Sequence, residues 1–328
     1  MNVSLKESGA KFVFNFAEVY WNSRLQMEHA RLIQSIQDTS LTNTPTNPNN
    51  YGNEVTSLVV ADMMAGVGPF AVPLAMSRGH HPNLPKNLPP IQVHANGTLT
   101  YHIHVKNHHY AYLYNQCFSV CIDLNPASFR YLLQNRKLNH LENNGLLSVY
   151  NMDGRDFILE LLYKKKQCFH EVIMNLPQSA EMFLDVFIGL YRHTLEPTPA
   201  AGDNGDGGQV MSGTLFSRPP RIHLYAFSKN VEDPIRDVRD RAAAVLQCCA
   251  ADLTPDSTAT DATLTSASRS KEQGLSWQGH IVRDVSPKKV MVYLSFVLPV
   301  SVVNAKPAIF MEESSVIGVK RALEESHT

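Results

Sequence analysis

The sequence predicts an α/β fold in which helices cover both faces of a doubly wound, mostly parallel, seven-stranded sheet, preceded by a short N-terminal strand–helix extension. Two observations support this. Short apolar runs alternate with amphipathic segments through the middle of the chain. In addition, the apolar run that ends at Asp62 is followed by a glycine-rich turn, Ala-Gly-Val-Gly-Pro-Phe at 65–70, and by a new apolar segment. Strand, tight turn and helix start in that order form the opening unit of such a sheet.

Length and composition exclude several classes of protein. A chain of 328 residues has room for one large or two modest domains. Its 29 Lys and Arg against 30 Asp and Glu give no chain-wide attraction for nucleic acid, so an RNA site would be a local patch. No apolar run reaches the ~20 residues of a membrane span, and the N-terminus lacks a secretory signal. Five cysteines without a CxxC pair fit an intracellular protein, and the sequence does not choose among cytoplasm, nucleus and mitochondrial matrix.

The first 53 residues predict a strand and a helix followed by a loop. Residues 11–20 are aromatic-rich and partly alternating, which favours a strand. Asn22 or Ser23 suits a helix N-cap, and apolar residues then recur at helical spacing to about Gln37. Residues 39–53, rich in Thr, Asn and Pro, predict a loop. We therefore expect 1–53 to be an extension of a main domain at 54–299.

Within the main domain, strands and helices alternate in the pattern of a parallel sheet. After the strand ending at Asp62 we expect a helix at 69–77, a strand at 118–123, a helix at 125–138, a strand at 146–150, a helix to 163, a strand at 171–175 and a helix at 180–191. The sheet resumes at 221–227, followed by a helix at 231–249 and terminal strands at 280–285 and 290–298. Residues 300–328 are expected to be a tail outside the core.

Three segments do not fit this alternation of strands and helices. They are interpreted as insertions, at about 78–115, 197–217 and 250–276. The first contains clustered Pro and Asn, and its residues 92–105 predict a hairpin around Asn96-Gly97. Its residues His102, His104, His108 and His109 lack an acidic or cysteine partner at ligand spacing, so no metal site is expected. The other two segments are of low complexity.

Polar residues stand at the expected strand ends: Asp62, Asp123, Asp153 and Asn175. The carboxyl ends of the strands in a doubly wound sheet converge on one crevice. There a carboxylate at Asp123 can accept both hydroxyls of a ribose, and one at Asp153 can accept from the exocyclic amine of an adenine. Each aspartate alone could equally cap a helix. The ordered set after a glycine-rich turn predicts a cofactor that contains a nucleoside.

The glycine-rich turn distinguishes between two cofactors that contain a nucleoside, a dinucleotide and S-adenosylmethionine. A dinucleotide site requires a third glycine and backbone N–H groups that hold a pyrophosphate. Here Phe70 stands at the third glycine position and Pro69 has no N–H. S-adenosylmethionine carries no phosphate and needs no such site, so the turn favours it, with Gly66 and Gly68 allowing close approach of the ligand.

Seven motifs follow one another along the chain: Glu18-Val-Tyr-Trp-Asn-Ser-Arg-Leu-Gln-Met-Glu-His, Asp62-Met-Met-Ala-Gly-Val-Gly-Pro-Phe, Asp123-Leu-Asn-Pro, Asn151-Met-Asp-Gly-Arg-Asp-Phe, Val172-Ile-Met-Asn-Leu-Pro, His223-Leu-Tyr-Ala-Phe-Ser-Lys and Val282-Arg-Asp-Val-Ser-Pro. Together they resemble the archaeal and eukaryotic family of tRNA (guanine-N1)-methyltransferases. The resemblance implies a Rossmann-like class I methyltransferase domain at 54–299, with 1–53 as a remnant of an RNA-binding subdomain and a linking helix. It implies methyl transfer from S-adenosylmethionine to N1 of guanine 37 in the anticodon loop of tRNA, by a monomer.

The resemblance also implies roles for individual residues. With the strand-end Asp62, the implied cofactor-binding residues are His29, Gly66, Gly68, Asp123, Leu124, Asp153, Gly154 and Asn175. Glu28 would be the general base, because N1 of guanine is a poor nucleophile until its proton is removed. Arg24 would stabilise charge at O6, and Asn175 would orient the base or the cofactor. Arg24 and Glu28 share a helical face at i, i+4, where the residues alone suggest a surface ion pair.

The target base must leave the anticodon stack, and Tyr20, Trp21 or Phe70 could support it by stacking.

Two rival functions stay open. One is the aminocarboxypropyl transferase of wybutosine synthesis, which uses the same cofactor; the motifs at 68–70 and 175–177 favour the methyltransferase instead. The other is a cofactor- and RNA-binding module without catalysis, against which Glu28 and Asn175 argue. The family usually carries an N-terminal module that grips tRNA and a further upstream arginine. The sequence lacks both, so we expect weakened tRNA binding and activity.

Overall fold

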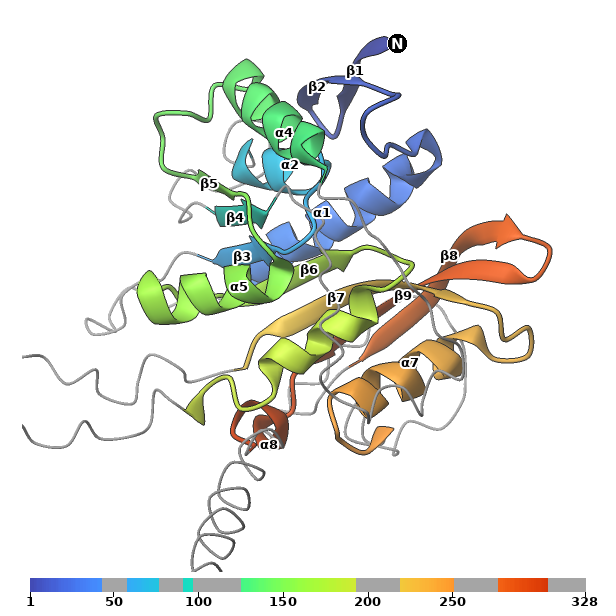
Figure 1. The fold of residues 1–328 in the computed structure, drawn as a ribbon. Helices are drawn as coiled ribbons and strands as arrows, with labels where there is room; N and C mark the ends of the chain where they lie inside the picture. Colours follow the sequence, from blue (N-terminus) through green and yellow to red (C-terminus); the bar gives the residue numbers. More distant parts are fainter. Residues whose placement is uncertain (43–57, 77–90, 97–124, 193–218, 251–276, 306–328) are drawn as a thin grey trace, which may run out of the picture.

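A seven-stranded sheet forms the centre of the computed structural model, which describes residues 1–42, 58–76, 91–96, 125–192, 219–250 and 277–305 (Figure 1). The strand order is β5-β4-β3-β6-β7-β9-β8. The first five of these pair in parallel, whereas β9 is antiparallel to both β7 and β8. The predicted sheet is therefore confirmed. Its strands are β3 (Val59–Asp62), β4 (Gln92–Asn96), β5 (Leu147–Tyr150), β6 (Glu171–Asn175), β7 (Arg221–Ser228), β8 (Gln278–Ser286) and β9 (Lys289–Val297).

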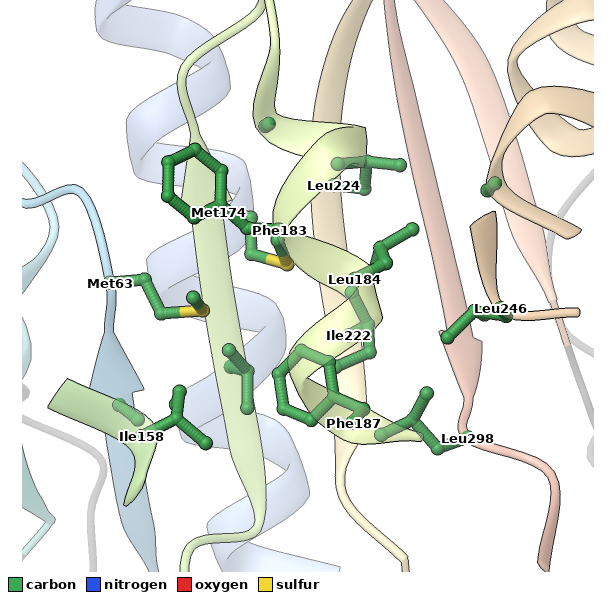
Figure 2. Packing of buried hydrophobic residues seen from close by; sticks show 14 of the residues in the cluster. Met63, Ile158, Met174, Phe183, Leu184, Phe187, Ile222, Leu224, Leu246 and Leu298 are labelled. Carbon is green, nitrogen blue, oxygen red and sulfur yellow. The ribbon is translucent and has the colours of Figure 1, made fainter. Parts of the chain in front are cut away.

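Helices cover both faces of this sheet. They are α1 (Gln26–Thr42), α2 (Ala71–Met76), α4 (Pro126–Leu138), α5 (Gly154–Leu159), the π-helical η2 (Glu160–Lys164), the 3-10 helix η3 (Ala180–Phe187), α7 (Pro234–Val245) and α8 (Val300–Val303). One face packs against α5, η3 and α7, and Figure 2 shows Phe183 and Phe187 of η3 lying over Met174 and Ile222 of the sheet. The other face packs against α1, α2 and α4. Burial on both sides explains why the central parallel strands are almost wholly apolar.

The N-terminal extension is a hairpin followed by a long helix. Strands β1 (Asn2–Glu7) and β2 (Ala10–Asn15) pair antiparallel, so the strand expected at 11–20 is present but ends earlier. The Asn22 side chain accepts a hydrogen bond from Arg24 N and starts the 3-10 turn η1 (Ser23–Leu25), which confirms the predicted N-cap. Helix α1 then continues to Thr42, so residues 39–42 are helical and not part of a loop.

Two asparagines fasten the hairpin to α4. Asn135 Oδ1 accepts from Val13 N at 2.8 Å, and its Nδ2 donates to Val67 O at 3.0 Å. Asn139 Oδ1 accepts from Lys11 N at 2.8 Å, while its Nδ2 donates to Lys11 O at 2.7 Å. Residues four apart lie on one helical face. The two amides therefore supply the hydrogen bonds that a third strand would otherwise give to the outer edge of β2.

The largest difference from the sequence prediction concerns the strand beside β3. The sequence predicts a hairpin over 92–105 inside an insertion, whereas Gln92–Asn96 form β4, which pairs in parallel with β3 and β5. Strand β4 thus occupies the place expected for 118–123. Residues 118–123, and the rest of 78–115 apart from Ile91, lie outside the described residues. Ile91, Val93 and Ala95 alternate along the chain and are buried, as in a strand. The neighbouring clusters of Pro and Asn favour an insertion when only the sequence is considered.

The prediction of a tail from residue 300 onward is wrong for the first few residues. Val302 and Val303 of α8 are buried in the core. Their carbonyls accept hydrogen bonds from Gly189 N at 2.9 Å and Tyr191 N at 2.8 Å. The predicted helices at 180–191 and 231–249 are present but shorter, and the first is a 3-10 helix. The insertion expected at 197–217 lies outside the described residues, as does that at 250–276 except for Ala250.

We expect Asn135→Ala to destabilise the protein by about 1–3 kcal/mol, because it leaves Val13 N–H and Val67 C=O without their side-chain partner. Chemical denaturation measures the change. The neighbouring Gln134 is exposed, so Gln134→Ala is the matched control and should stay within about 0.5 kcal/mol. Equal losses for the two variants would contradict the role given to Asn135.

Candidate functional site

The carboxyl ends of the parallel strands bring polar side chains to one edge of the sheet. Asp62 is the last residue of β3, Asn96 of β4 and Asn175 of β6, and Asp153 follows β5. The predicted convergence of Asp62, Asp153 and Asn175 on this edge is thus present. The predicted site residues Asp123 and Leu124 lie outside the described residues.

The two glycines of the turn after β3 differ in their surroundings. Both have positive φ, 53° at Gly66 and 97° at Gly68, which disfavours other residues. No atom of the described residues lies within 4 Å of the position that a Cβ at Gly66 would take, so among these residues the position faces open space that a ligand can approach. A Cβ at Gly68 would lie 2.7 Å from Val72 Cγ2 and 2.8 Å from Leu132 Cδ1. Gly68 is therefore explained by the close packing of α2 and α4.

Asp62 is fully buried at the end of β3. Its Oδ1 accepts a long hydrogen bond from Met64 N at 3.4 Å, and its Oδ2 finds no partner within the described part of the chain. Burial raises the pKa of this carboxyl to about 7, with the bond from Met64 N opposing it. The site thus contains a buried oxygen that a bound ligand could satisfy.

Asn96 lies at the candidate site and was not among the residues predicted from the sequence. Its Nδ2 donates to Met152 O at 2.8 Å and Met63 O at 3.3 Å, and its Oδ1 accepts from Met152 N at 3.2 Å. Its own carbonyl accepts from Ala65 N at 2.9 Å. This fully buried amide therefore holds the glycine-rich turn against the segment after β5. Because Asn96 is followed by Gly97, the sequence predicts a hairpin turn at this position and gives no sign that the Asn96 amide is buried.

Asp153 and Gly154 form the start of α5. Asp153 Oδ1 accepts from Arg155 N at 2.8 Å, so the aspartate acts as the helix cap. Burial, outweighing the hydrogen bond and the charge of Arg155, raises the pKa of Asp153. Gly154 is buried, with Phe183 3.4 Å from the position of its missing Cβ. Their contact with a cofactor stays a prediction.

Asn175 faces the same side of the sheet as α1. It pairs in register with Tyr225 of β7, and its side chain shares a face with Ile173, which packs in the core on the α1 side. Asn175 Oδ1 is buried and has no hydrogen-bond partner among the described residues. A second unsatisfied acceptor thus lies at this strand edge.

Glu28 projects from the first turn of α1 onto this same face. It is only 9% exposed, and both its oxygens are hydrogen-bonded. Oε1 accepts from Arg31 Nη2 at 2.6 Å and from Tyr225 Oη at 2.9 Å, while Oε2 accepts from Arg31 Nε at 2.9 Å and lies 3.1 Å from His280 Nε2. Burial would raise its pKa, but the hydrogen bonds and charges of Arg31 and His280 hold it at about 2. Glu28 is therefore a carboxylate at neutral pH.

Arg24 does not form the surface ion pair with Glu28 that the spacing suggests, and the contact of His29 with a cofactor stays a prediction. Arg24 is exposed in η1, and Glu28 forms its ion pairs with Arg31 and His280, so the i, i+4 surface pair does not form. His29 is buried, its Nδ1 lies 2.6 Å from Glu7 Oε1, and its ring meets Phe70 edge-on at 4.8 Å. The histidine thus joins the hairpin, α1 and the glycine-rich turn.

Of the three aromatic residues suggested for stacking on a base, only one is accessible in the structure. Trp21 packs between Phe12 and Phe14 at 5.4 and 4.9 Å, and Phe70 is fully buried beside Tyr225. Tyr20 is 70% exposed.

Two kinds of feature do not occur in the described ranges. These ranges contain no helix that is both long and apolar enough to cross a membrane. They also contain no cluster of three or more His, Cys, Asp or Glu side chains placed to hold a metal ion.

The strand order and the polar strand edge define a Rossmann-like class I methyltransferase fold. Residues 93–194 match the family model of the TRM5/TYW2 methyltransferase domain. The chain is 36% identical over 302 residues to the tRNA (guanine(37)-N(1))-methyltransferase of Phytophthora infestans, covering 92% of this chain and 48% of the relative. It is 33% identical over 324 residues to tRNA (guanine(37)-N(1))-methyltransferase 1 of Phaeodactylum tricornutum, covering 97% and 53%. The resemblance carried by the seven motifs is therefore confirmed.

The chain spans about half the length of the curated relatives that it matches. Among solved structures, the crystal structure of Trm5b from Pyrococcus abyssi aligns with a TM-score of 0.47 and 17% identity, covering 90% of this chain and 55% of that one. The strand order, and not this likeness, shows the fold.

We expect Asp62→Asn to reduce the pH dependence of stability. An acid whose pKa is raised by folding holds its proton more tightly in the folded state, so stability falls as pH rises from about 4 to about 7. Asparagine does not titrate, and the loss between pH 5 and pH 8 should shrink by about 1–4 kcal/mol. Thermal and urea unfolding at both pH values measures this. Asp38→Asn on the exposed side of α1 is the control, and an unchanged slope for Asp62→Asn would refute the assignment.

Proposed function

We propose that this chain forms the cofactor-binding and catalytic part of an S-adenosylmethionine-dependent methyltransferase that acts on N1 of guanine 37 in tRNA. The observation that carries the proposal is the buried, ionised Glu28, which shares a face of the sheet with Asn175 at the carboxyl ends of the strands. The named activity of the relatives, and the methyltransferase domain that the chain matches, support the same assignment.

The residues present fit an S-adenosylmethionine site. Gly66 leaves open space beside the backbone, and Asp62 and Asn175 each offer a buried oxygen that needs a donor. We assign the ribose to Asp123, next to Leu124, and the adenine amine to Asp153, next to Gly154. His29 contributes by supporting the glycine-rich turn, because its ring packs against Phe70 of that turn. When bound, the cofactor supplies an electrophilic methyl group.

Glu28 takes the N1 proton of the guanine in this proposal. A carboxylate with a pKa of about 2 is ionised at neutral pH but is a weak proton acceptor, because its lone pairs already receive hydrogen bonds. The incoming N1–H must therefore replace one of these bonds, and such contacts commonly rearrange when substrate binds. His280 has the longest contact with Glu28 among the three partners, 3.1 Å, which makes it the partner to be displaced.

Other residues of the site position the guanine. Asn175 can orient the base or the cofactor from the end of β6. The exposed Arg24 can reach toward O6, where negative charge develops as N1 loses its proton. Tyr20, also exposed, offers its ring to the base outside the anticodon stack.

We expect Glu28→Ala to lower methyl transfer by at least about 10²–10⁴-fold while cofactor affinity stays within a few-fold, because the carboxylate contacts the base and not the cofactor. Asp123→Ala should do the reverse and chiefly weaken cofactor binding. Calorimetry gives the affinities, and nucleoside mass spectrometry of unmodified tRNA transcripts with G37 or A37 gives the product. Near-full turnover by Glu28→Ala, or methylation of A37 as fast as of G37, would overturn the assignment.

The matched domain model names two groups, TRM5 and TYW2, so the aminocarboxypropyl transferase is the second candidate. The same mass spectrometry separates them, because one methyl and the larger arm add different masses. Cofactor binding without any product on G37 transcripts would instead favour the non-catalytic module.

A further inference from the structure

A group of side chains from three separate parts of the chain converges on Glu28. Arg31 lies one turn along α1 and binds both carboxylate oxygens. Tyr225 comes from the centre of the sheet in β7 and is 1% exposed, and His280 comes from β8 at the sheet edge. The three donors come from different elements, so they fix the orientation of the carboxylate and also favour its ionised form.

Arg31 is itself held in place by a second contact. Its guanidinium carbon lies 4.3 Å from the ring centroid of Tyr293 in β9, a cation–π arrangement that fixes its plane. Tyr293 also packs against Tyr225 at 5.2 Å and His280 at 5.0 Å. Among the described residues, the titratable and charged groups that face Glu28 are thus Arg31, Tyr225, His280 and Tyr293, and within this set Arg31 carries the permanent positive charge.

We propose that Arg31, Tyr225 and His280 are positioning residues for Glu28, and that Arg31, rather than Arg24, sets the pH at which this carboxylate takes up a proton. The catalytic part of this inference rests on the proposed function, in which Glu28 is the general base. The geometric reason is that a planar arginine fork satisfies both carboxylate oxygens at once, whereas Arg24 lies exposed outside α1.

The charge balance agrees with this arrangement. Burial alone would raise the pKa of Glu28, and the contacts from Arg31 and His280 reverse that effect. Without Arg31 the buried carboxylate loses its strongest stabilising partner. An opposite charge at this distance lowers a carboxyl pKa by about 1–3 units, and its removal should return a shift of that size.

The test compares Arg31→Gln, Arg31→Lys and the unchanged full chain. Arg236→Gln is the matched control, because Arg236 forms an exposed i, i+4 ion pair with Asp240 on α7. The first measurement is the titration of the Glu28 carboxyl by ¹³C NMR, assigned by the signal lost in Glu28→Gln. The second is the pH dependence of kcat and KM for methyl transfer to the G37 transcript.

We expect Arg31→Gln to raise the titration midpoint of Glu28 by about 1–3 pH units and to move the acid limb of kcat by the same amount, with KM for the cofactor unchanged. Arg31→Lys keeps the charge without the fork, so its titration midpoint for Glu28 should lie between those of Arg31→Gln and the unchanged protein. Arg236→Gln should match the unchanged protein in both measurements.

A Glu28 midpoint that is the same in Arg31→Gln as in the unchanged protein would overturn the proposal. A moved midpoint with an unmoved acid limb would overturn its catalytic part. If no variant and not even the unchanged chain transfers methyl, the NMR titration still decides what Arg31 does, and the failure belongs to the proposed function. Should Arg31→Gln not fold, Tyr225→Phe removes one donor without changing charge, and an unchanged Glu28 midpoint in it would also contradict the network.

Discussion

The arrangement of the candidate site depends on one buried carboxylate and the groups that keep it charged. Glu28 lies between a helix of the N-terminal extension and the face of the sheet, and its hydrogen bonds join α1 to β7 and β8. An unpaired buried carboxylate would be protonated or would destabilise the fold. Because Arg31, Tyr225 and His280 satisfy it, α1 is held in one orientation against β7, β9 and β8. The same contacts that locate the extension therefore also locate the proposed base.

The carboxyl ends of the strands next to Glu28 contain both rigidly held groups and unsatisfied hydrogen-bond acceptors. Asn96 is fully hydrogen-bonded and fixes the glycine-rich turn, while His29 and Phe70 support that turn from the side of α1. Against this support, Asp62 and Asn175 each leave one buried oxygen without a partner in the described residues. Buried polar atoms are rarely left unpaired in native proteins, and those that are often mark a ligand site. This contrast between satisfied and unsatisfied groups is what the proposed cofactor site at these strand ends relies on.

Much of the sheet could be predicted because its local signals agree with its tertiary setting. The apolar runs of β3, β6 and β7, with the turn residues that end them, indicate buried parallel strands. Strand β4 could not be predicted in the same way, since its five residues stand between Pro- and Asn-rich segments and end in an Asn-Gly pair typical of a hairpin. Only pairing with β3 and β5 makes this short segment a central strand.

Several features of the site can be identified from the amino-acid sequence. They are the residue types at the strand ends, the glycine-rich turn without a phosphate-binding pattern, and the motifs that resemble those of the tRNA (guanine-N1)-methyltransferases. Tertiary structure alone decided which of these groups meet. Arg24 does not pair with Glu28, and Gly68 lies against packed helices whereas Gly66 faces open space among the described residues. Tyr225 and His280 contact the Glu28 carboxylate from 197 and 252 residues away in the chain. The physical reason is that hydrogen-bond partners and burial depend on distances in space, and local spacing along a chain does not encode contacts between segments that far apart.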